Sequence, residues 1–337
     1  MKRKILKSFT ALMIVGMFSS QTLAFAAGNN VSGDDQTLRN HGLQTNIIEA
    51  IDSNAKNNIA NALRTDPSSV SINTSVTVVD NLAEVEKFCS YTDAELVNMG
   101  ANSNEVVKER NMIEQWYATP DEQLADNYGL SQVETKLLKK AIDKGKAEFK
   151  NRKGSNANND VVASGTISEG QLTYTEVAVD QRTSAPNYLV TCAYSWSYPY
   201  LLAIFNDEIA VGWGGALNTK NVSGGYHLRS VDFTSSNWTD SSVGYTPASI
   251  THENPNVSLE FAFPQSFNSL KTDSGSVSFN LYQTQRQGYD TKVVSNYLHR
   301  EIGISASVDI SVSGLAVTLT PVGSWNQSPQ RSATISF

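Results

Sequence analysis

The sequence predicts an α+β protein in two domains, a small N-terminal helical domain followed by a C-terminal antiparallel β-sandwich. Two observations lead to this prediction. Apolar residues recur every three or four positions in the first half of the chain but alternate with polar residues in the second half. The charged fraction also falls where the pattern changes: 34 of the 134 residues from 27 to 160 are charged, against 21 of the 177 residues from 161 to 337.

Residues 1–26 predict a signal peptide. A basic stretch over 2–7 precedes an apolar run over 9–18, and residues 24–26 supply an A-x-A cleavage site. An uncleaved N-terminal anchor is the alternative. Cleavage removes four positive charges and changes the formal net charge from −7 to −11. We therefore expect a secreted, extracellular protein with a disordered lead-in over 27–43.

Composition also limits the partners. No other stretch approaches 18 consecutive apolar residues, so we expect no second membrane segment. We expect no nucleic-acid partner either, because phosphate binding requires clustered Lys and Arg and an acidic chain repels a polyanion. Two cysteines in 337 residues exclude a disulfide-dense scaffold.

The predicted helical domain covers 44–150. Apolar residues over 47–63 and over 133–149 each form one stripe along a helix. A β-prone run over 70–79 interrupts the helical pattern. Capping boxes predict three helix starts, at Thr92, Thr119 and Ser131.

A weak internal repeat within this half predicts two helical hairpins. Each copy contains a capped short helix, a glycine stop at Gly100 or Gly129, and a second helix. The hairpins could grip a partner, but ordinary helix packing units are the favoured interpretation. The polar stretch over 151–160 predicts a linker to the second domain.

The β-sandwich is predicted over 161–337, with a single sheet closed on itself as the alternative. The longest alternating run, over 302–312, is followed by a turn at Ser313-Gly314 and a second run over 315–319, which predicts a hairpin. Asn206-Asp207 separates two further apolar runs and predicts another hairpin turn.

A row of aromatic residues is the main candidate for ligand binding. Two-residue spacing along a regular strand would place the row on one face, where it could stack on sugars or lie at a membrane interface. A thick aromatic layer in the sandwich core is the favoured alternative. The candidate residues are Tyr194, Trp196, Tyr198 and Tyr200.

The two cysteines allow two interpretations. Cys89 and Cys192 could form a disulfide that ties the helical domain to the β domain. Cys192 is also the best candidate nucleophile, since three histidines follow it in the same half, but its surroundings read as a strand, which does not lower a thiol pKa. A buried small apolar residue is the third interpretation of Cys192.

Other catalytic patterns are weak. The carboxylate pairs Asp207-Glu208 and Asp93/Glu95 could serve a hydrolase, although Asp207-Glu208 is better explained as charges at a hairpin tip. Pro255 interrupts the only segment that begins like a zinc motif, so we predict no metal site and no cofactor.

We therefore predict a secreted, non-enzymatic protein whose β-sandwich binds a surface ligand or partner, with the helical domain as an accessory. Possible partners are a cell-surface glycan, a membrane or a protein; the oligomeric state is left open. One alternative is a membrane-active secreted toxin or bacteriocin-like factor that uses the hairpin over 302–321. The other is a secreted hydrolase that uses Cys192 or a carboxylate pair.

Overall fold

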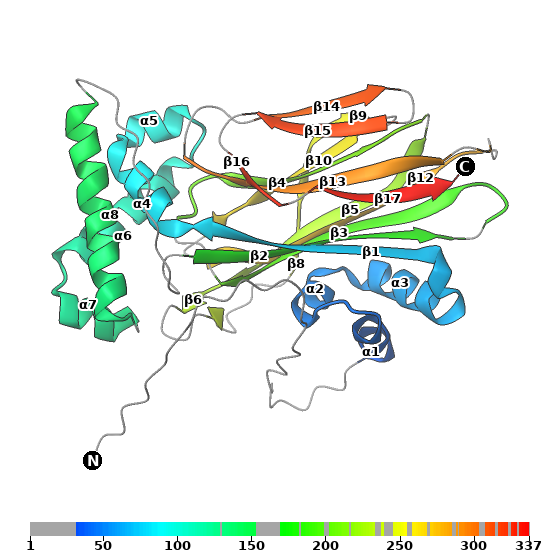
Figure 1. Ribbon diagram of the computed structural model, residues 1–337, viewed down its shortest axis with the longest axis horizontal. Coiled ribbons are helices and arrows are strands. Elements are labelled where there is room, and N and C mark those ends of the chain that lie inside the picture. The colour runs from blue at the N-terminus through cyan, green and yellow to red at the C-terminus, as the bar shows by residue number, and fades with distance from the viewer. Residues whose placement is uncertain are drawn as a thin grey trace, which may run out of the picture. The chain divides into compact units, whose positions relative to one another are not determined.

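Helices dominate the chain up to residue 151, and antiparallel strands dominate the rest (Figure 1). The structure is a computed structural model. It describes residues 32–128, 130–152, 169–181, 183–198, 202–215, 217–232, 237–238, 245–254, 258–267, 270–284, 288, 290–302, 307–313, 316–322, 325–328 and 330–336. The predicted signal peptide over 1–26 lies outside these residues, as does most of the predicted linker over 151–160.

Two antiparallel sheets form the sandwich. The larger has seven strands in the order β1-β2-β3-β12-β5-β8, with β11 paired to the end of β12. Its strands are β1 Val70–Asp80, β2 Glu169–Asp180, β3 Asn187–Tyr198, β5 Asn218–Arg229, β8 Tyr245–Pro247, β11 Ser266–Phe267 and β12 Leu270–Tyr282.

The smaller sheet has six strands in the order β16-β13-β4-β10-β9, with β17 also paired to β13. Its strands are β4 Asn206–Trp213, β9 Ser249–Asn254, β10 Ser258–Pro264, β13 Asp290–Arg300, β16 Trp325–Gln327 and β17 Arg331–Ser336. A short separate pair is formed by β6 Val231–Asp232 and β7 Asn237–Trp238.

The main core lies between the two sheets. Alternation along the strands sends every second side chain inward, and the inward residues of both sheets form one apolar cluster. Its largest members are fully buried aromatic side chains: Trp196, Trp213, Tyr174, Tyr194, Tyr297, Phe261, Phe263 and Phe279.

Three short helices cover part of the outer face of the seven-stranded sheet (Figure 1). We call them the α1–α3 layer. Their apolar stripe packs on Val177 and Val179 of β2 and on Leu189 and Ala193 of β3. The helices are α1 Gly33–Asn40, α2 Thr45–Ala50 and α3 Ser53–Thr65, and a 3-10 turn over Pro67–Ser69 leads into β1.

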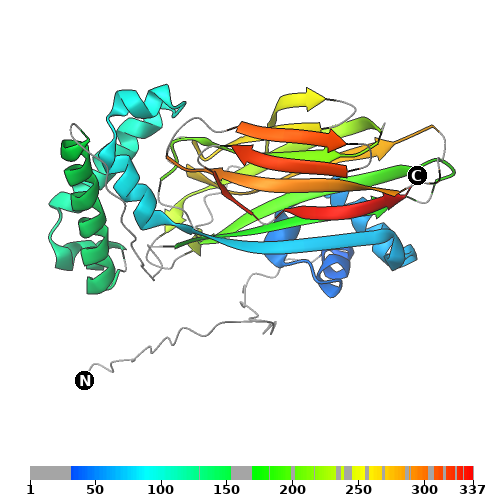
Figure 2. The same ribbon diagram turned by 45° about the horizontal axis from the view of Figure 1, so that its top comes forward.

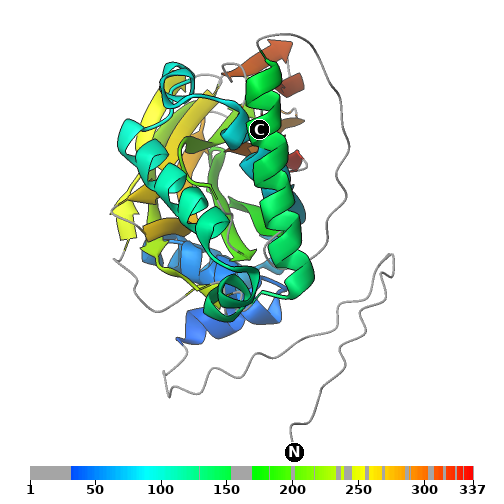
Figure 3. The same cartoon turned by 90° about the vertical axis from the view of Figure 1, so that its left-hand side faces the viewer.

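Five further helices, which we call the helical cap, lie at one end of the strands (Figure 3). The side chains of Thr92 and Ser131 each begin a helix with a complete capping box, as their sequence predicts. Gly145 lets α8 approach α4 closely, since an added Cβ would lie 2.3 Å from the Glu86 carbonyl oxygen. The helices are α4 Asn81–Ser90, α5 Asp93–Asn98, α6 Ser103–Ala118, α7 Asp121–Tyr128 and α8 Gln132–Asn151.

The N-terminal half differs from the prediction in two places. The expected disordered lead-in over 27–43 contains helix α1. The apolar stripe over 47–63 belongs to two helices, because the chain is extended at Ile51 and Asp52, and the Asp52 side chain accepts hydrogen bonds from the first backbone N–H groups of α3.

The expected division into a helical and a β domain also differs from the observed contacts. The β-prone run over 70–79 is strand β1, which pairs with β2 along its whole length. Apolar residues from the strand half, Leu202, Ile204, Phe205 and Ile302, belong to the core of the helical cap. Residues 33–337 consequently form one compact unit.

The predicted hairpin after residue 302 is present as β14 Ser307–Ser313 and β15 Ala316–Val322. Its described residues pair only with each other, and the hairpin lies against the outer face of the six-stranded sheet (Figure 2). Leu319 packs with Ala210, Val294 and Leu298 in this contact. Within the described part of the chain, no helix has both the length and the apolarity to cross a membrane.

Candidate functional site

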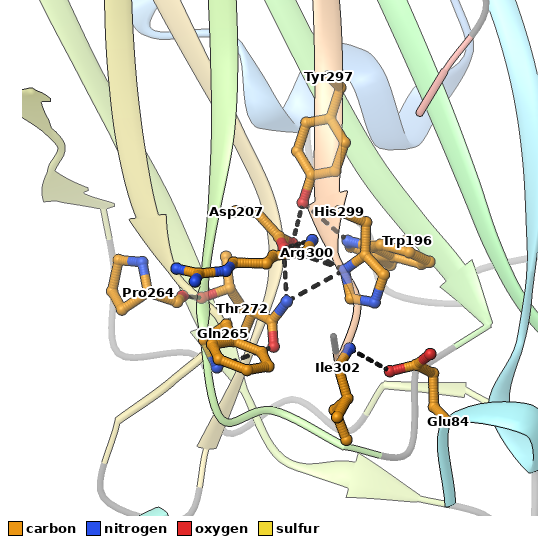
Figure 4. Close-up of polar contacts among 11 residues, drawn as sticks. Glu84, Trp196, Asp207, Pro264, Gln265, Thr272, Tyr297, His299, Arg300 and Ile302 are labelled. Carbon is orange, nitrogen blue, oxygen red and sulfur yellow. Dashed lines mark hydrogen bonds and ion pairs between the residues drawn. The ribbon is translucent and has the colours of Figure 1, made fainter. Parts of the chain in front are cut away.

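A buried polar cluster lies where β4 begins and β13 ends (Figure 4). Asp207, 2% exposed, is its centre. Its carboxylate accepts hydrogen bonds from Tyr297 Oη at 2.5 Å, Gln265 Nε2 at 2.5 Å and the Arg300 backbone N–H at 3.2 Å, and His299 Nδ1 lies 3.0 Å away. These five residues are called the Asp207 cluster below.

Aromatic rings and an arginine extend the Asp207 cluster. Trp196 Nε1 donates to Tyr297 Oη at 3.3 Å, and the Trp196 ring contacts the His299 ring edge to face at 5.1 Å. The Arg300 guanidinium donates to the Met99 carbonyl of the helical cap and lies over the Phe205 ring. The cluster therefore links β4, β13 and the helical cap.

The charge of His299 depends on Asp207. Burial is the largest influence on His299 and lowers its pKa, but the adjacent Asp207 carboxylate, together with the carboxylates of Glu84 and Glu301, raises this pKa above its ordinary value. Hydrolases use an Asp–His pair to activate a nucleophile that substrate can reach. His299 is only 3% exposed and Asp207 2%, so a substrate cannot reach this pair in the structure.

The carboxylate pairs have structural roles. Asp207 is not a hairpin-tip charge, because residues 202–205 are not a strand and Asp207 lies inside β4. Neighbouring Glu208 points the other way, and burial, with Glu260 nearby, raises its pKa to about 7. Asp93 pairs with Arg110 at 2.7 Å, and Glu95 completes the capping box of α5.

Both cysteines are free thiols. Cys89 belongs to the core of the helical cap and Cys192 to the core between the sheets, so the predicted disulfide between them is not formed. Cys192 is fully buried, and burial, together with the nearby Glu176 carboxyl, raises its pKa to about 12. A thiol with this pKa stays protonated at neutral pH, so the structure favours the apolar interpretation of Cys192.

Two of the four aromatic candidates lie in the core. Tyr194 is 0% and Trp196 1% exposed, so they cannot stack on a ligand. The alternation that places them on one face directs that face inward, where Tyr194 packs on Tyr297 and Phe263. The side chain of Tyr198 and all of Tyr200 lie outside the described part of the structure.

Metal ligands are not gathered at any point in the described residues: no three His, Cys, Asp or Glu side chains there are placed to hold an ion. The described surface feature that stands out is strand β1, at the edge of the seven-stranded sheet (Figure 2).

Strand β1 has 11 residues and keeps its register with β2 throughout. It carries no charged residue before Asp80. Val70 and Ile72 pack under the α1–α3 layer, but further along the same face, beyond Thr74, Val76 and Val78 are each 49% exposed. Among the described strands, only β2 pairs with β1.

Other sheet edges are shorter or irregular. Strands β8 and β16 have three residues each, and β9 has six residues with a register shift against β10. Strand β17 has six residues and begins with Arg331. Short length, bulges and charge are the usual means of blocking unwanted strand pairing. Strand β1 has none of these features along residues 70–79.

No protein-family profile and no curated protein sequence matches the chain. Several solved structures match part of it. The C-terminal domain of the Streptococcus pyogenes antigen I/II-family protein AspA is 10% identical, with 50% of this chain and 54% of that chain covered and a TM-score of 0.28. The collagen adhesin CNA of S. aureus is 11% identical, with 51% and 68% covered and a TM-score of 0.23.

The KRT10-binding region domain of the pneumococcal serine-rich repeat protein PsrP also matches, at 9% identity and a TM-score of 0.21, with 40% of this chain and 79% of that chain covered. The chain spans little more than half of the antigen I/II-family domain. Likenesses at this level assign the chain to none of these groups.

Proposed function

We propose that the chain is a secreted, non-enzymatic protein that binds an extended segment of a partner protein along the edge of β1. The observation that carries this proposal is the combination of a long, uncharged edge strand with two half-exposed valines beside it. The helical cap is an accessory element. The Asp207 cluster has a structural role, because the side chains of Asp207, His299, Gln265 and Tyr297 are each at most 3% exposed.

Strand addition fits this edge chemically. An edge strand presents a row of unpaired backbone N–H and C=O groups, and an added strand pairs them. Alternate side chains of the added strand would then lie beside Val76 and Val78, which gives the contact an apolar component. Strand β1 carries no aromatic side chain that could stack on a sugar, so an extended protein segment is favoured over a glycan at this edge.

Replacing both valines by lysine tests the proposal. The chain without residues 1–26 is measured by surface plasmon resonance against a panel of immobilised cell-surface and extracellular-matrix proteins. We expect at least one protein to bind, and Val76→Lys with Val78→Lys to weaken that binding by about tenfold or more, because charge on an edge opposes strand pairing.

Val107→Lys is the matched control, since Val107 of α6 is 51% exposed but lies on the helical cap. It should bind as the unsubstituted chain does. Absence of binding to every protein in the panel contradicts the proposal, as does equal loss in the control. A dimer in gel filtration that disappears with the β1 substitutions would identify a second copy of the chain as the occupant instead.

The β14–β15 hairpin supports a second candidate function, membrane activity. Its strands carry Ile310, Val317 and Leu319 toward the six-stranded sheet and Ser311 and Thr318 on the exposed face. Since the described residues of the hairpin share no ladder hydrogen bonds with that sheet, they could leave it without breaking backbone pairing. Leakage of dye from anionic vesicles, reduced by Leu319→Asp, would support this candidate; intact vesicles would remove it.

A further inference from the structure

Helix α8 is a basic element in an acidic chain. It contains six lysines and three acidic residues, whereas the formal net charge of the whole chain is −7. Figure 1 shows α8 on the side of the helical cap that faces away from the strands. The residues of α8 that are buried against the cap are Thr135, Leu138, Ala141, Ile142 and Gly145. The opposite face of the helix is therefore a surface of the protein.

Four lysines follow this outer face. Lys136, Lys140 and Lys144 are spaced by four residues, so they lie one helical turn apart and on the side opposite to the buried residues. Lys150 continues the row near the end of the helix and is exposed. At 1.5 Å per residue the row is about 20 Å long. We call these four residues the α8 lysine strip.

Few acidic side chains compensate the α8 lysine strip. Lys144 Nζ lies 2.6 Å from Glu86 Oε1 of α4, but Lys136, Lys140 and Lys150 form no ion pair with any of the described residues. The acidic residues of α8 include Glu134, which is engaged in the capping box at Ser131. The strip therefore presents uncompensated positive charge to the solvent.

Apolar and aromatic side chains lie beside these lysines. Val133, three residues before Lys136 on the same face, is 66% exposed. Tyr117 of α6 is 39% exposed, its hydroxyl donates to Asp143 Oδ1 at 2.6 Å, and Lys146 Nζ lies 3.8 Å from its ring centroid. An aromatic ring with a polar tip and an exposed aliphatic side chain both gain from contact with the boundary between lipid headgroups and acyl chains.

We propose that the α8 lysine strip docks the protein on an anionic lipid bilayer, with α8 lying along the membrane surface. An anionic surface attracts clustered lysines and repels the acidic remainder of the chain, so the charge distribution selects this face for contact. A bilayer is flat, and a straight outer helix can place all four lysines on it at once. A soluble polyanion would use the lysines but would gain nothing from Val133.

Vesicle binding of the mature chain tests the proposal. The chain without residues 1–26 is incubated with vesicles of phosphatidylcholine that contain about one-third phosphatidylglycerol, at about 0.1 M salt, and the bound fraction is measured by flotation. We expect binding to these vesicles, little binding to pure phosphatidylcholine, and release at about 0.5 M salt, because salt screens the attraction between lysines and lipid headgroups.

Lys136→Gln combined with Lys140→Gln should weaken binding by about tenfold or more, since each lysine near an anionic surface contributes about fivefold. Both side chains are exposed, so the fold is expected to persist, and circular dichroism checks this. The matched control is Lys220→Gln combined with Lys292→Gln, which removes the same charge from exposed positions on β5 and β13. The control should bind within about twofold of the unsubstituted chain.

Val133→Ser separates a bilayer from a soluble polyanion. It should weaken vesicle binding by about threefold through the loss of apolar contact. Long-chain inorganic polyphosphate, measured by fluorescence anisotropy, is the comparison. Binding of polyphosphate that is as tight as binding to vesicles, with Val133→Ser changing neither, would overturn the assignment to lipid.

Two further results would overturn the proposal. One is a mature chain that does not bind the anionic vesicles. The other is an equal loss of binding in the two lysine double variants, which would show that overall charge and not the α8 lysine strip decides the contact. No partner protein is present in these measurements, so docking through α8 is tested separately from the function of β1.

Discussion

The α1–α3 layer and the helical cap are attached to the same sandwich by different chemistry. The layer packs through aliphatic side chains, among them Ile47 and Ile48 of α2 against Leu189 of β3. No charged residue of α1–α3 is buried. The cap combines an apolar core with three buried glutamates, and its contact with the strands includes ion pairs and charge-assisted hydrogen bonds.

The two attachments should therefore differ in how strongly they depend on the protonation of their side chains. Burial of aliphatic surface stabilises a contact by about 25 cal/mol per Å², and it does not depend on protonation. A buried ion pair has to offset the desolvation of both charges, so its net contribution is small and changes when either partner gains or loses a proton. We therefore expect the attachment of the α1–α3 layer to depend less on pH than the attachment of the cap.

Among the substitutions proposed here, removal of the Asp207 carboxylate should cause the largest loss of stability. Asp207→Ala leaves His299, Gln265 and Tyr297 without their common acceptor, and it leaves a buried imidazolium without its counter-charge. We expect a loss of about 3–5 kcal/mol in the free energy of unfolding, measured by urea denaturation near pH 6.

The loss should shrink as the pH rises. The stabilising charge of His299 is fully present below its ordinary pKa and disappears as the pH passes the raised value, so Asp207→Ala should cost less near pH 9 than near pH 6. Asp207→Asn, which keeps an acceptor and the volume, should cost less than Asp207→Ala. A loss below about 1 kcal/mol for Asp207→Ala would show that the cluster contributes little.

Local features of the fold could be predicted from the sequence, because they depend on neighbouring residues. The strand over 70–79, the capping boxes at Thr92 and Ser131 and the hairpin turn after Ser313 all follow from short patterns. The split between α2 and α3 was missed because the apolar stripe continues across it, although Asp52 carries the cap of the second helix.

The Asp207 cluster could not be predicted, because its members are far apart in the sequence. Antiparallel pairing of β4 with β13 sets Glu208 opposite Leu298, which brings Asp207 beside His299. Two-residue spacing of Tyr297 and His299 does place them on one face, but it does not show what they face. In the same way, one alternating run could not show that β1 is a sheet edge, since its partner strand lies about a hundred residues away.

A substitution in the α1–α3 layer gives the counterpart of Asp207→Ala, with a smaller effect. Ile47 is 0% exposed in α2, the helix that lies on β3. Ile47→Ala removes buried methyl groups and leaves a cavity, so we expect a loss of about 2–4 kcal/mol in the free energy of unfolding. Ile47→Val, which removes one methylene group, should cost about 1 kcal/mol.

The pH dependence of this loss is the decisive measurement. The apolar cluster around Ile47 contains no ionisable side chain, so the loss should be the same near pH 5.5 and near pH 8. The backbone N–H groups of Ile302 and Asn102 bond across the contact between the cap and the sandwich. Their hydrogen exchange should change in Ile47→Ala only by as much as the global loss of stability accounts for, because Ile47 does not touch the cap. A loss that varied with pH would mean that the two attachments are coupled through the sheet.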